Sequence, residues 1–203
     1  MILMYHKIDI VVPTKWWVSV AAFERQINEL SNYDFVFLDN YEPDNPKQCV
    51  ITFDDSYENV YRHAFPILRK RCLPFEIFIN ASYLADWNNF NKSEPLTRFC
   101  SVDQLEIMAA NGARIQWHSN YHQILTDLSI DGVISELEIP ADLLAKFPEP
   151  NFRWFAYPYG MHNEMVRYLV AQRFRGALSV EDGIDGDRYQ IMRSIVTDDS
   201  KFD

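Results

Sequence analysis

The stretch that decides the fold is 49–56, with the sequence CVITFDDS. Its apolar first half is typical of a buried strand, and two adjacent carboxylates, Asp54 and Asp55, follow directly. Because side chains alternate along a strand, we expect one carboxylate on each side of its axis. Two acids this close ionise together at low cost in a partly buried site only beside a cation. Asp-Asp before Ser is also common in turns, so this stretch alone leaves a turn and a catalytic site open.

A second polar cluster follows the apolar segment 113–117, where His118 and His122 stand four residues apart. Two histidines at this spacing share one face of a helical turn, which suits joint ligation of one metal ion. The same spacing also fits two unrelated packing histidines. Both clusters stand where a strand gives way to a loop, which is where α/β proteins carry their functional sites. One carboxylate and two imidazoles leave coordination positions open, which is typical of catalytic rather than structural metal sites.

These motifs resemble those of the polysaccharide deacetylases. The matching stretches are 52–56 (TFDDS), 118–122 (HSNYH), 123–129 (QILTDLS) and 155–160 (FAYPYG), in the order and spacing of that family. The start of the chain, 3–8 (LMYHKI), is similar to the opening strand of the branch that acts on poly-N-acetylglucosamine-like substrates. The resemblance covers nearly the whole chain. It implies a carbohydrate esterase that removes N-acetyl groups from chitin, peptidoglycan or poly-N-acetylglucosamine.

Strand and helix patterns alternate along the chain, which favours a parallel sheet. The family resemblance implies an α/β fold, a distorted and incomplete (β/α)7 barrel, forming a single catalytic domain over 1–203. Ser19 and the capping box of Ser101 and Gln104 mark two helix starts. We expect strands at 1–6, 36–38, 49–54, 75–80, 113–117, 154–157, 176–179 and 190–196. We expect helices at 20–31, 57–71, 101–112, 131–146 and 163–173, and an irregular excursion over the barrel mouth at 81–98.

Composition narrows the function classes. The chain has 203 residues, 48% of them hydrophobic and 15% aromatic, which is typical of one globular domain. Its net charge of −10 disfavours nucleic acid and anionic membrane surfaces as partners. The three cysteines form no CxxC pair and indicate neither a disulfide framework nor a thiolate metal site. No stretch reaches the ~18 apolar residues of a membrane span. The first residues lack the features of a signal peptide, so we expect a cytoplasmic protein.

The chain departs from the family pattern at two motif positions. Many members have Gly after the two acids, where this chain has Ser56. Many members also have an Arg that restrains the catalytic Asp, at the position where this chain has Ala156. We expect Arg193, from the strand at 190–196, to supply that positive charge to Asp54. The alternative for Arg193 is a surface position at a strand end.

The proton donor is also displaced. The family usually provides a late His, and no His follows His162 here. His6 is the expected substitute, because the first strand would place it on the same rim as the two acids, and the similar branch looks circularly permuted. A packing histidine is the alternative. We expect His63 and His162 to have structural or, at most, substrate-side roles.

The resemblance implies the following chemistry. Asp55, His118 and His122 hold one divalent metal ion, most simply zinc, with manganese, cobalt or nickel as alternatives, and the metal lowers the pKa of a bound water. Asp54 accepts the proton of that water as the acetamide carbonyl is attacked. The main-chain N–H of Tyr159 stabilises the developing oxyanion.

Aromatic residues offer stacking faces for a sugar ring, and we expect Tyr157 and Trp87, with Trp117 and Phe90 as further candidates. The expected partner is an N-acetylated sugar or glycan of the cell envelope. Polymeric, lipid-linked and nucleotide-linked sugars all remain open. Non-haem iron oxygenases use the same ligand types, but with a different spacing. The second function hypothesis is a degenerate deacetylase fold that binds a glycan without cleaving it.

Overall fold

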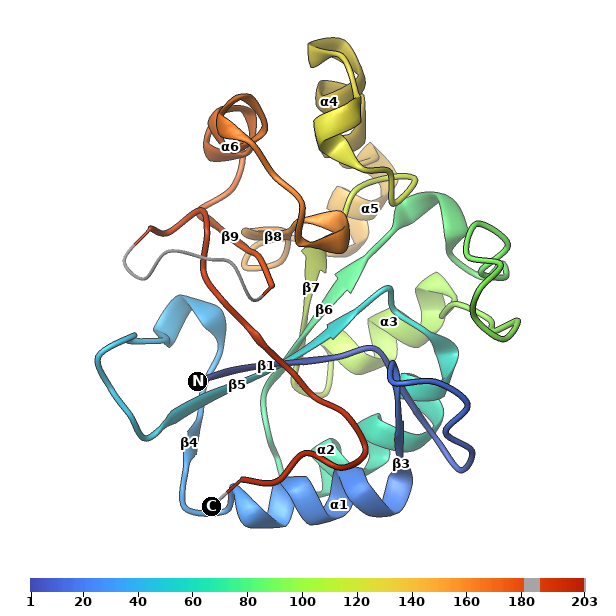
Figure 1. Cartoon of the computed structure of the whole chain (residues 1–203), viewed down its shortest axis with the longest axis vertical. Helices are drawn as coiled ribbons and strands as arrows, with labels where there is room; N and C mark the ends of the chain where they lie inside the picture. The colour runs from blue at the N-terminus through green and yellow to red at the C-terminus, as the bar shows by residue number, and fades with distance from the viewer. Residues whose placement is uncertain (181–186, 203) are drawn as a thin grey trace.

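The computed structural model describes residues 1–180 and 187–202. Within this range the strands form one eight-stranded sheet, ordered β10-β1-β5-β6-β7-β8-β9 with β4 beside β5, and a separate pair, β2 and β3. Each strand pair runs parallel. The strands are β1 (Ile2–Tyr5), β2 (Lys7–Asp9), β3 (Trp17–Ser19), β4 (Asp34–Phe35), β5 (Gln48–Asp54), β6 (Phe75–Ile79), β7 (Ala113–Trp117), β8 (Trp154–Ala156), β9 (Gly176–Leu178) and β10 (Ser194–Ile195). The curled sheet confirms the predicted incomplete barrel of one domain (Figure 1).

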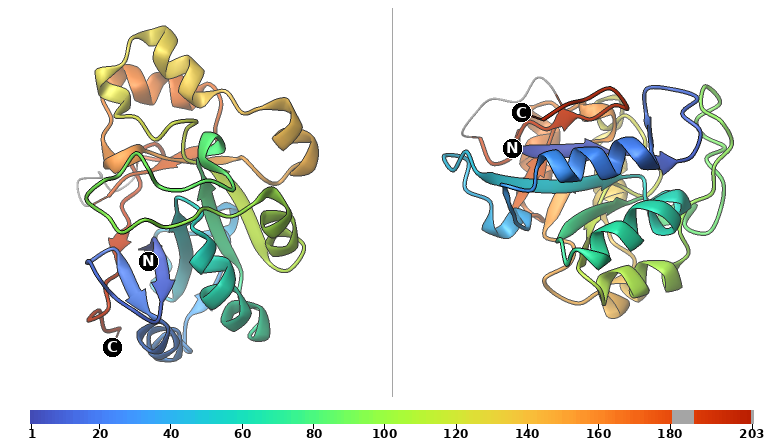
Figure 2. Two further views of the ribbon diagram at one scale, coloured as in Figure 1. Left: turned by 90° about the vertical axis from the view of Figure 1, so that its right-hand side faces the viewer. Right: turned by 90° about the horizontal axis from the view of Figure 1, so that it is seen from below.

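Six α-helices surround the sheet in the described part of the chain. α1 to α3 lie beside the half of the sheet that β1, β5, β6 and β7 form, whereas α4 to α6 gather near β8 and β9 (Figures 1 and 2). None of the described helices is long and apolar enough to cross a membrane. The helices are α1 (Val20–Glu29), α2 (Phe65–Lys70), α3 (Val102–Ala109), α4 (Ile130–Leu137), α5 (Ala141–Lys146) and α6 (Glu164–Ala171).

The sheet separates two cores. On β5, Ile51 and Phe53 belong to the larger cluster, which also takes in the buried faces of the surrounding helices. Val50 on the same strand belongs to a smaller cluster with Phe78 and Trp154, inside the curl of the sheet. This alternation follows from the period of two along a strand. The side chains that point inside the curl are followed, at the carboxyl ends of the strands, by the polar residues of the candidate site.

The segment 190–196 closes the seam between β9 and β1. Ile191 bridges to Leu178 of β9, and three residues later Ser194 begins the pairing of β10 with Leu3 and Met4 of β1. The predicted strand forms as only these short pieces, because the segment changes partner from one edge of the sheet to the other. Arg193 stands at this change of partner.

Two of the predicted helices are interrupted at prolines. The helix expected at 57–71 begins with a π-helical turn, Val60–Ala64, before α2. Pro66 explains this widening, because it lacks the N–H that would continue the regular i to i−4 pattern. The helix expected at 131–146 is instead two helices, α4 and α5, with Pro140 at the start of the second.

Other sequence predictions hold with shifted ends. Ser19 caps α1 by accepting a hydrogen bond from the N–H of Ala22. The strand expected at 36–38 is wrong: β4 lies two residues earlier, and a 3₁₀ turn (Leu38–Asn40) follows it. The pair β2 and β3 was not predicted. The excursion expected at 81–98 is confirmed, with only a 3₁₀ turn (Ala81–Tyr83) and an isolated bridge between Trp87 and Arg98.

The predicted capping box is present at the start of α3. The Ser101 hydroxyl accepts from the N–H of Gln104, and the Gln104 side chain accepts from the N–H of Ser101. Ser101→Ala should lower the free energy of unfolding by about 1 kcal/mol, because one end of the box is lost. Chemical denaturation measures this change.

The matched control is Ser135→Ala, which replaces an exposed serine inside α4. Alanine has the higher helix propensity there, so stability should stay the same or rise by a few tenths of a kcal/mol, about the difference between the two propensities. Equal effects of the two substitutions would contradict the role of the box.

Candidate active site

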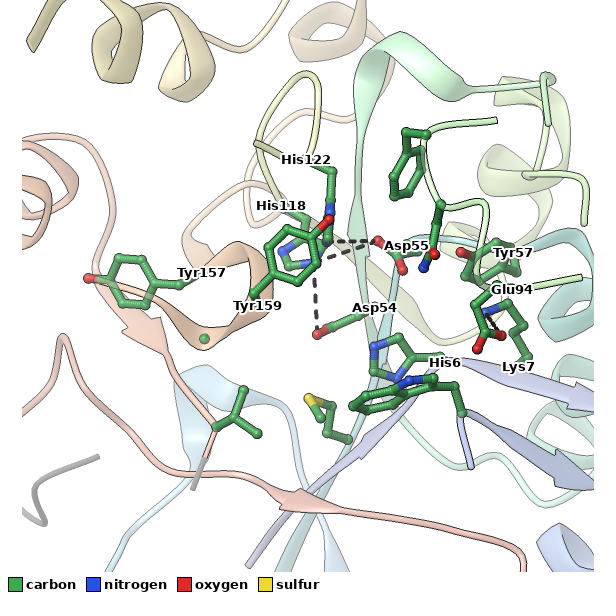
Figure 3. Close-up of a pocket in the computed structure, with 16 residues that line it drawn as sticks. His6, Lys7, Asp54, Asp55, Tyr57, Glu94, His118, His122, Tyr157 and Tyr159 are labelled. Carbon is green, nitrogen blue, oxygen red and sulfur yellow. Dashed lines mark hydrogen bonds and ion pairs between the residues drawn. The ribbon is translucent and has the colours of Figure 1, made fainter. Parts of the chain in front are cut away.

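The candidate site lies at the carboxyl ends of the central strands. The inward-facing series on β5 is Val50, Thr52 and Asp54, and the series on β7 leads through Gln116 to His118. Because Met4 pairs with Thr52, the same alternation carries the first strand to His6 beside Asp54. His6, Asp54 and His118, at the ends of these series, line a pocket of about 230 Å³. Figure 3 shows the three side chains close to one another in this pocket.

Asp55, His118 and His122 form a compact group of possible metal ligands. One ligand atom from each lies within 4.8 Å of the others, and all three residues are buried. Oδ1 of Asp55 lies 3.4 Å from Nε2 of His122 and 3.7 Å from Nε2 of His118. Ligand atoms about 2.1 Å from a tetrahedrally coordinated ion stand about 3.4 Å apart. The three atoms are therefore spaced to share one ion.

Their hydrogen bonds leave the same atoms free for a metal. Nδ1 of His118 lies 2.7 Å from the main-chain oxygen of Ala156 and donates to it, which leaves Nε2 as the nitrogen that faces Asp55. Oδ1 of Asp55 is buried and accepts no hydrogen bond in the described part of the chain. Burial lowers the pKa of His122 to about 4, so this imidazole is neutral at neutral pH. A buried acceptor without a donor, beside two imidazole nitrogens, fits a divalent cation.

The backbone brings both acids into the pocket in a way that strand alternation does not predict. β5 ends at Asp54, and Asp55 and Ser56 have φ values of 70° and 52°. The expectation of one carboxylate on each side of the strand is therefore wrong, because the chain turns at Asp55. The positive φ also gives a reason for the Gly that many family members have at position 56, since Gly adopts this conformation without a steric penalty.

The two histidines meet across a loop and not on a helical turn, so that expectation is wrong as well. Ser119 and His122 have φ values of 77° and 52°, and the Ser119 hydroxyl accepts from the N–H of His122 at 3.0 Å. The ring centroids of His118 and His122 are 4.8 Å apart. A turn stabilised by a side chain thus replaces the helical face.

Arg193 lies where we expected it. Its two terminal nitrogens donate to the two oxygens of Asp54 at 2.6 and 2.7 Å, and both side chains are buried. Arg193 also donates to the main-chain oxygen of Ser179 and to the hydroxyl of Thr52. Burial alone would raise the pKa of Asp54, but the charge of Arg193 outweighs it and holds the pKa far below its usual range. Asp54 is therefore an oriented, ionised carboxylate.

His6 also lines the pocket, and its ring centroid lies 4.8 Å from that of Trp16. Burial lowers the pKa of His6 to about 4, although Asp54 and Asp55 act in the opposite direction. The nearby carboxylates therefore do not keep this imidazole protonated, as a donor ready at the start of its step would require. His6 is neutral at neutral pH.

The aromatic residues expected to stack on a sugar differ in their burial and in their position relative to the pocket. Tyr157 is among the residues that line the pocket, but its side chain is fully buried and its hydroxyl donates to the main-chain oxygen of Tyr189, so it presents no exposed ring face. Figure 3 shows it directed away from Asp54. Trp117 is also fully buried. Trp87 is 44% exposed but is not among the residues that line the pocket, whereas Phe90 is.

Tyr159 lines the pocket beside the two histidine ligands. Its φ of 59° turns the chain, and its half-exposed ring lies 4.6 Å from the ring of His122. His63 lies outside the site and pairs with Asp9 at 3.7 Å. His162 borders a neighbouring cavity, and its Nδ1 lies 3.1 Å from Arg167.

Sequence reasoning missed a second group of pocket residues: Lys7, Trp16, Tyr57 and Glu94. Lys7 and Trp16 belong to the segment that leaves the barrel sheet after β1 and forms the separate pair of β2 and β3. In the sequence, the only feature that associates Lys7 and Trp16 with the site is their position close to the stretch 3–7 (LMYHK). Glu94 comes from the irregular excursion, where no pattern marks it.

Comparison with known proteins places this geometry in a family. Residues 41–173 match the model of the polysaccharide deacetylase family. The chain belongs to the polysaccharide deacetylases. The poly-beta-1,6-N-acetyl-D-glucosamine N-deacetylase of Staphylococcus aureus (strain NCTC 8325 / PS 47) is 26% identical over 204 residues, which cover 90% of this chain and 69% of the relative. The enzyme of the same name from Staphylococcus epidermidis is also 26% identical, over 205 residues and with the same coverage.

Solved structures share the fold. The deacetylase PplD of Streptococcus pyogenes, solved in complex with acetate, has a TM-score of 0.80 and 24% identity, covering 98% of this chain and 92% of that protein. IcaB from Ammonifex degensii has a TM-score of 0.73 and 22% identity, with the same coverage. The staphylococcal relatives confirm the similarity to the poly-N-acetylglucosamine branch that the first strand indicated.

The ligand group leads to a prediction about metal content. His118→Ala and His122→Ala should each lose most of the bound divalent metal, because two ligands hold an ion much less tightly than three. His63→Ala is the matched control and should keep the metal of the parent protein. Elemental analysis after gentle purification measures the content. Stoichiometric metal in both site variants would contradict the assignment.

Proposed function

We propose that this protein is a metal-dependent deacetylase that removes N-acetyl groups from an amino-sugar polymer of the cell envelope. The observation that carries the proposal is the pairing of Asp55 with two imidazoles beside a second acid, Asp54, held by Arg193. Membership of the family supports hydrolysis of an N-acetylated glycan. The names of the staphylococcal relatives support poly-β-1,6-N-acetylglucosamine as the polymer.

Asp55, His118 and His122 would hold the metal. Two imidazoles and one carboxylate suit zinc, while manganese, cobalt and nickel accept the same ligand types. When bound, such an ion polarises a carbonyl oxygen and makes a coordinated water a better nucleophile at neutral pH. Residues of the chain would transfer the protons and stabilise the oxyanion.

Asp54 is the proposed general base. Arg193 occupies one lone pair on each carboxylate oxygen, and each oxygen has a second one to receive a proton. The bidentate contact fixes the carboxylate plane, so that water on the pocket side meets the same acceptor geometry in every turnover. Its low pKa makes Asp54 a weak base, and this limits how far the proton is transferred before the carbonyl is attacked.

His6 is the proposed donor to the leaving nitrogen. Hydrolysis converts the acetamide and one water into acetic acid and an amine, which ionise to acetate and an ammonium group, so one proton of the water must reach the nitrogen as the C–N bond breaks. A neutral His6 receives this proton within the reaction, by way of Asp54, before it donates. The main-chain N–H of Tyr159 is proposed to stabilise the oxyanion, in line with the family resemblance.

The alternative, a glycan-binding module without activity, depended on the missing Arg and the missing late His. Arg193 contacts Asp54 directly, and His6 lines the same pocket. The missing Arg and the missing late His therefore no longer argue for a protein without activity. We therefore favour the enzyme.

Acetate release by the metal-loaded protein tests the proposal. We expect release from β-1,6-linked N-acetylglucosamine oligosaccharides. Asp54→Asn keeps the shape of the side chain but removes the proton acceptor, so the rate should fall by ~10²–10⁴ with metal content unchanged. Parallel assays with chitin oligosaccharides and nucleotide-linked N-acetylglucosamine define the substrate class. No release from any of these substrates would contradict the proposal, and an Asp54→Asn protein without metal would reverse the roles of Asp54 and Asp55.

The role of His6 predicts a dependence on the leaving group. His6→Ala should slow release from an N-acetyl sugar by ~10²-fold or more, since an amine must be protonated to leave. It should slow hydrolysis of 4-nitrophenyl acetate much less, because nitrophenolate leaves without a proton. His162→Ala is the control. Equal losses on both substrates would instead make His6 a positioning residue.

A further inference from the structure

Lys7 is a buried cation at the edge of the pocket that the proposed reaction does not use. Its side chain is only 2% exposed, yet it lines the same cavity as the metal ligands. Figure 3 shows Lys7 and Glu94 on the far side of Asp55 from Tyr159. The chain leaves the barrel sheet after β1, which interrupts the alternation of side chains. His6 and the next residue, Lys7, therefore both line the pocket.

The ammonium group of Lys7 has donors to spare. Nζ lies 3.3 Å from Oε2 of Glu94, which is longer than a usual charge-assisted hydrogen bond. It lies 4.1 Å from the centre of the Tyr57 ring and 5.4 Å from that of Trp17. A lysine has three N–H donors, and Glu94 is its one hydrogen-bond acceptor in the described ranges 1–180 and 187–202.

Glu94 does not need Lys7 to stay in place. Its Oε2 also accepts from the indole N–H of Trp17 at 2.9 Å and from the hydroxyl of Thr14 at 3.1 Å. These contacts already join the excursion to the segment around β3. Burying an ammonium is costly, and apolar residues commonly replace buried ion pairs without loss of stability. Anchoring the excursion therefore does not account for a lysine at this position.

We propose that Lys7 binds the ring hydroxyl groups of the sugar whose acetamide is hydrolysed. The proposal deepens the proposed function and rests on it. The ammonium lies on the opposite side of Asp55 from Tyr159, so a sugar whose acetyl group reaches the metal ligands extends past Nζ. Trp16 and Phe90, which also line the pocket, offer apolar faces to the same ligand. Lys7 thereby acts as a specificity residue for the sugar and takes no part in bond cleavage.

The charges at this end of the pocket favour a neutral sugar. Lys7 is balanced by Glu94, and Arg193 is balanced by Asp54. No unbalanced cation among these residues is left to attract a diphosphate. Hydroxyl groups, by contrast, accept hydrogen bonds from an ammonium without disturbing its pairing with Glu94. The substrate class that fits is a neutral N-acetylated glycan rather than a nucleotide-linked sugar.

The test compares Lys7→Met with Lys146→Met. Lys146 forms an ion pair of similar length, 3.2 Å with Glu106, but on the surface. Binding of a β-1,6-linked N-acetylglucosamine pentamer is measured by calorimetry on zinc-loaded protein in an Asp54→Asn background, which prevents turnover. Lys7→Met should weaken binding about 10- to 100-fold, the range expected when a hydrogen bond from a charged group is lost. Lys146→Met should bind as the parent does.

Kinetics in the background with intact Asp54 provide the second readout. Lys7→Met should raise KM for the pentamer by a similar factor and leave kcat/KM for 4-nitrophenyl acetate within about threefold. The double variant Lys7→Met with Glu94→Gln avoids an unpaired buried carboxylate and should behave in the same way. It serves as the test protein if the single variant does not fold.

The outcomes separate this inference from the proposed function. Unchanged pentamer binding by the Lys7 variants, with acetate release intact in the parent, overturns the role of Lys7 alone. Equal losses on pentamer and aryl ester, with a lower melting temperature, make Lys7 structural and also overturn it. Tight binding of a nucleotide-linked sugar through Lys7 overturns the neutral class. Weakened binding by the variants, in a parent that releases no acetate, supports the role of Lys7 and refutes the deacetylase.

Discussion

The contact on which the site depends is the buried ion pair between Arg193 and Asp54. A single charge at either position would be strongly destabilising, because both side chains are almost completely buried. Two parallel hydrogen bonds of 2.6 and 2.7 Å satisfy both groups. Arg193 comes from the segment that closes the seam between β9 and β1, whereas Asp54 ends β5. The ionised, oriented state of Asp54 therefore depends on the segment that closes the barrel, because that segment carries Arg193.

Two adjacent carboxylates acquire different roles because they have different partners. Asp54 is neutralised by a guanidinium, and Asp55 faces two imidazoles with one oxygen that accepts no hydrogen bond from the residues that the structure describes. The left-handed turn at Asp55 makes this division possible, since it brings both acids to one pocket. Ala156 fits the same scheme. It carries no charge, but its main-chain oxygen orients His118, and the charge comes from another strand.

Much of this site was predictable from alternation along the strands. The period of two places Asp54, His118 and His6 at the inward end of their strands. Arg193 was predicted in another way, from the Arg that the family pattern has at position 156 and this chain lacks. Loop conformations were not predictable in this way. The positive φ values at Asp55, Ser119 and His122 arise from local hydrogen bonds and tertiary packing, which leave no periodic trace.

Tertiary packing also explains why the sequence did not predict the environments of Tyr157 and Glu94. Tyr157 looks available for stacking because its motif is functional, but its side chain packs into the core. Glu94 looks like one more acid in a polar excursion, and only the fold brings it to Lys7 and Trp17. The break between α4 and α5 was readable, because Pro140 stands within the helix that the pattern predicted.

The most direct test of the central claim is anomalous X-ray diffraction from zinc-loaded crystals, with data collected on both sides of the zinc absorption edge. The account predicts one strong anomalous peak within about 2.0–2.3 Å of a ligand atom from each of Asp55, His118 and His122. Oδ1 and Oδ2 of Asp54 should remain paired with Arg193 in the same crystal. A pocket without an anomalous peak, or a peak coordinated by Asp54 instead of Asp55, would contradict the account.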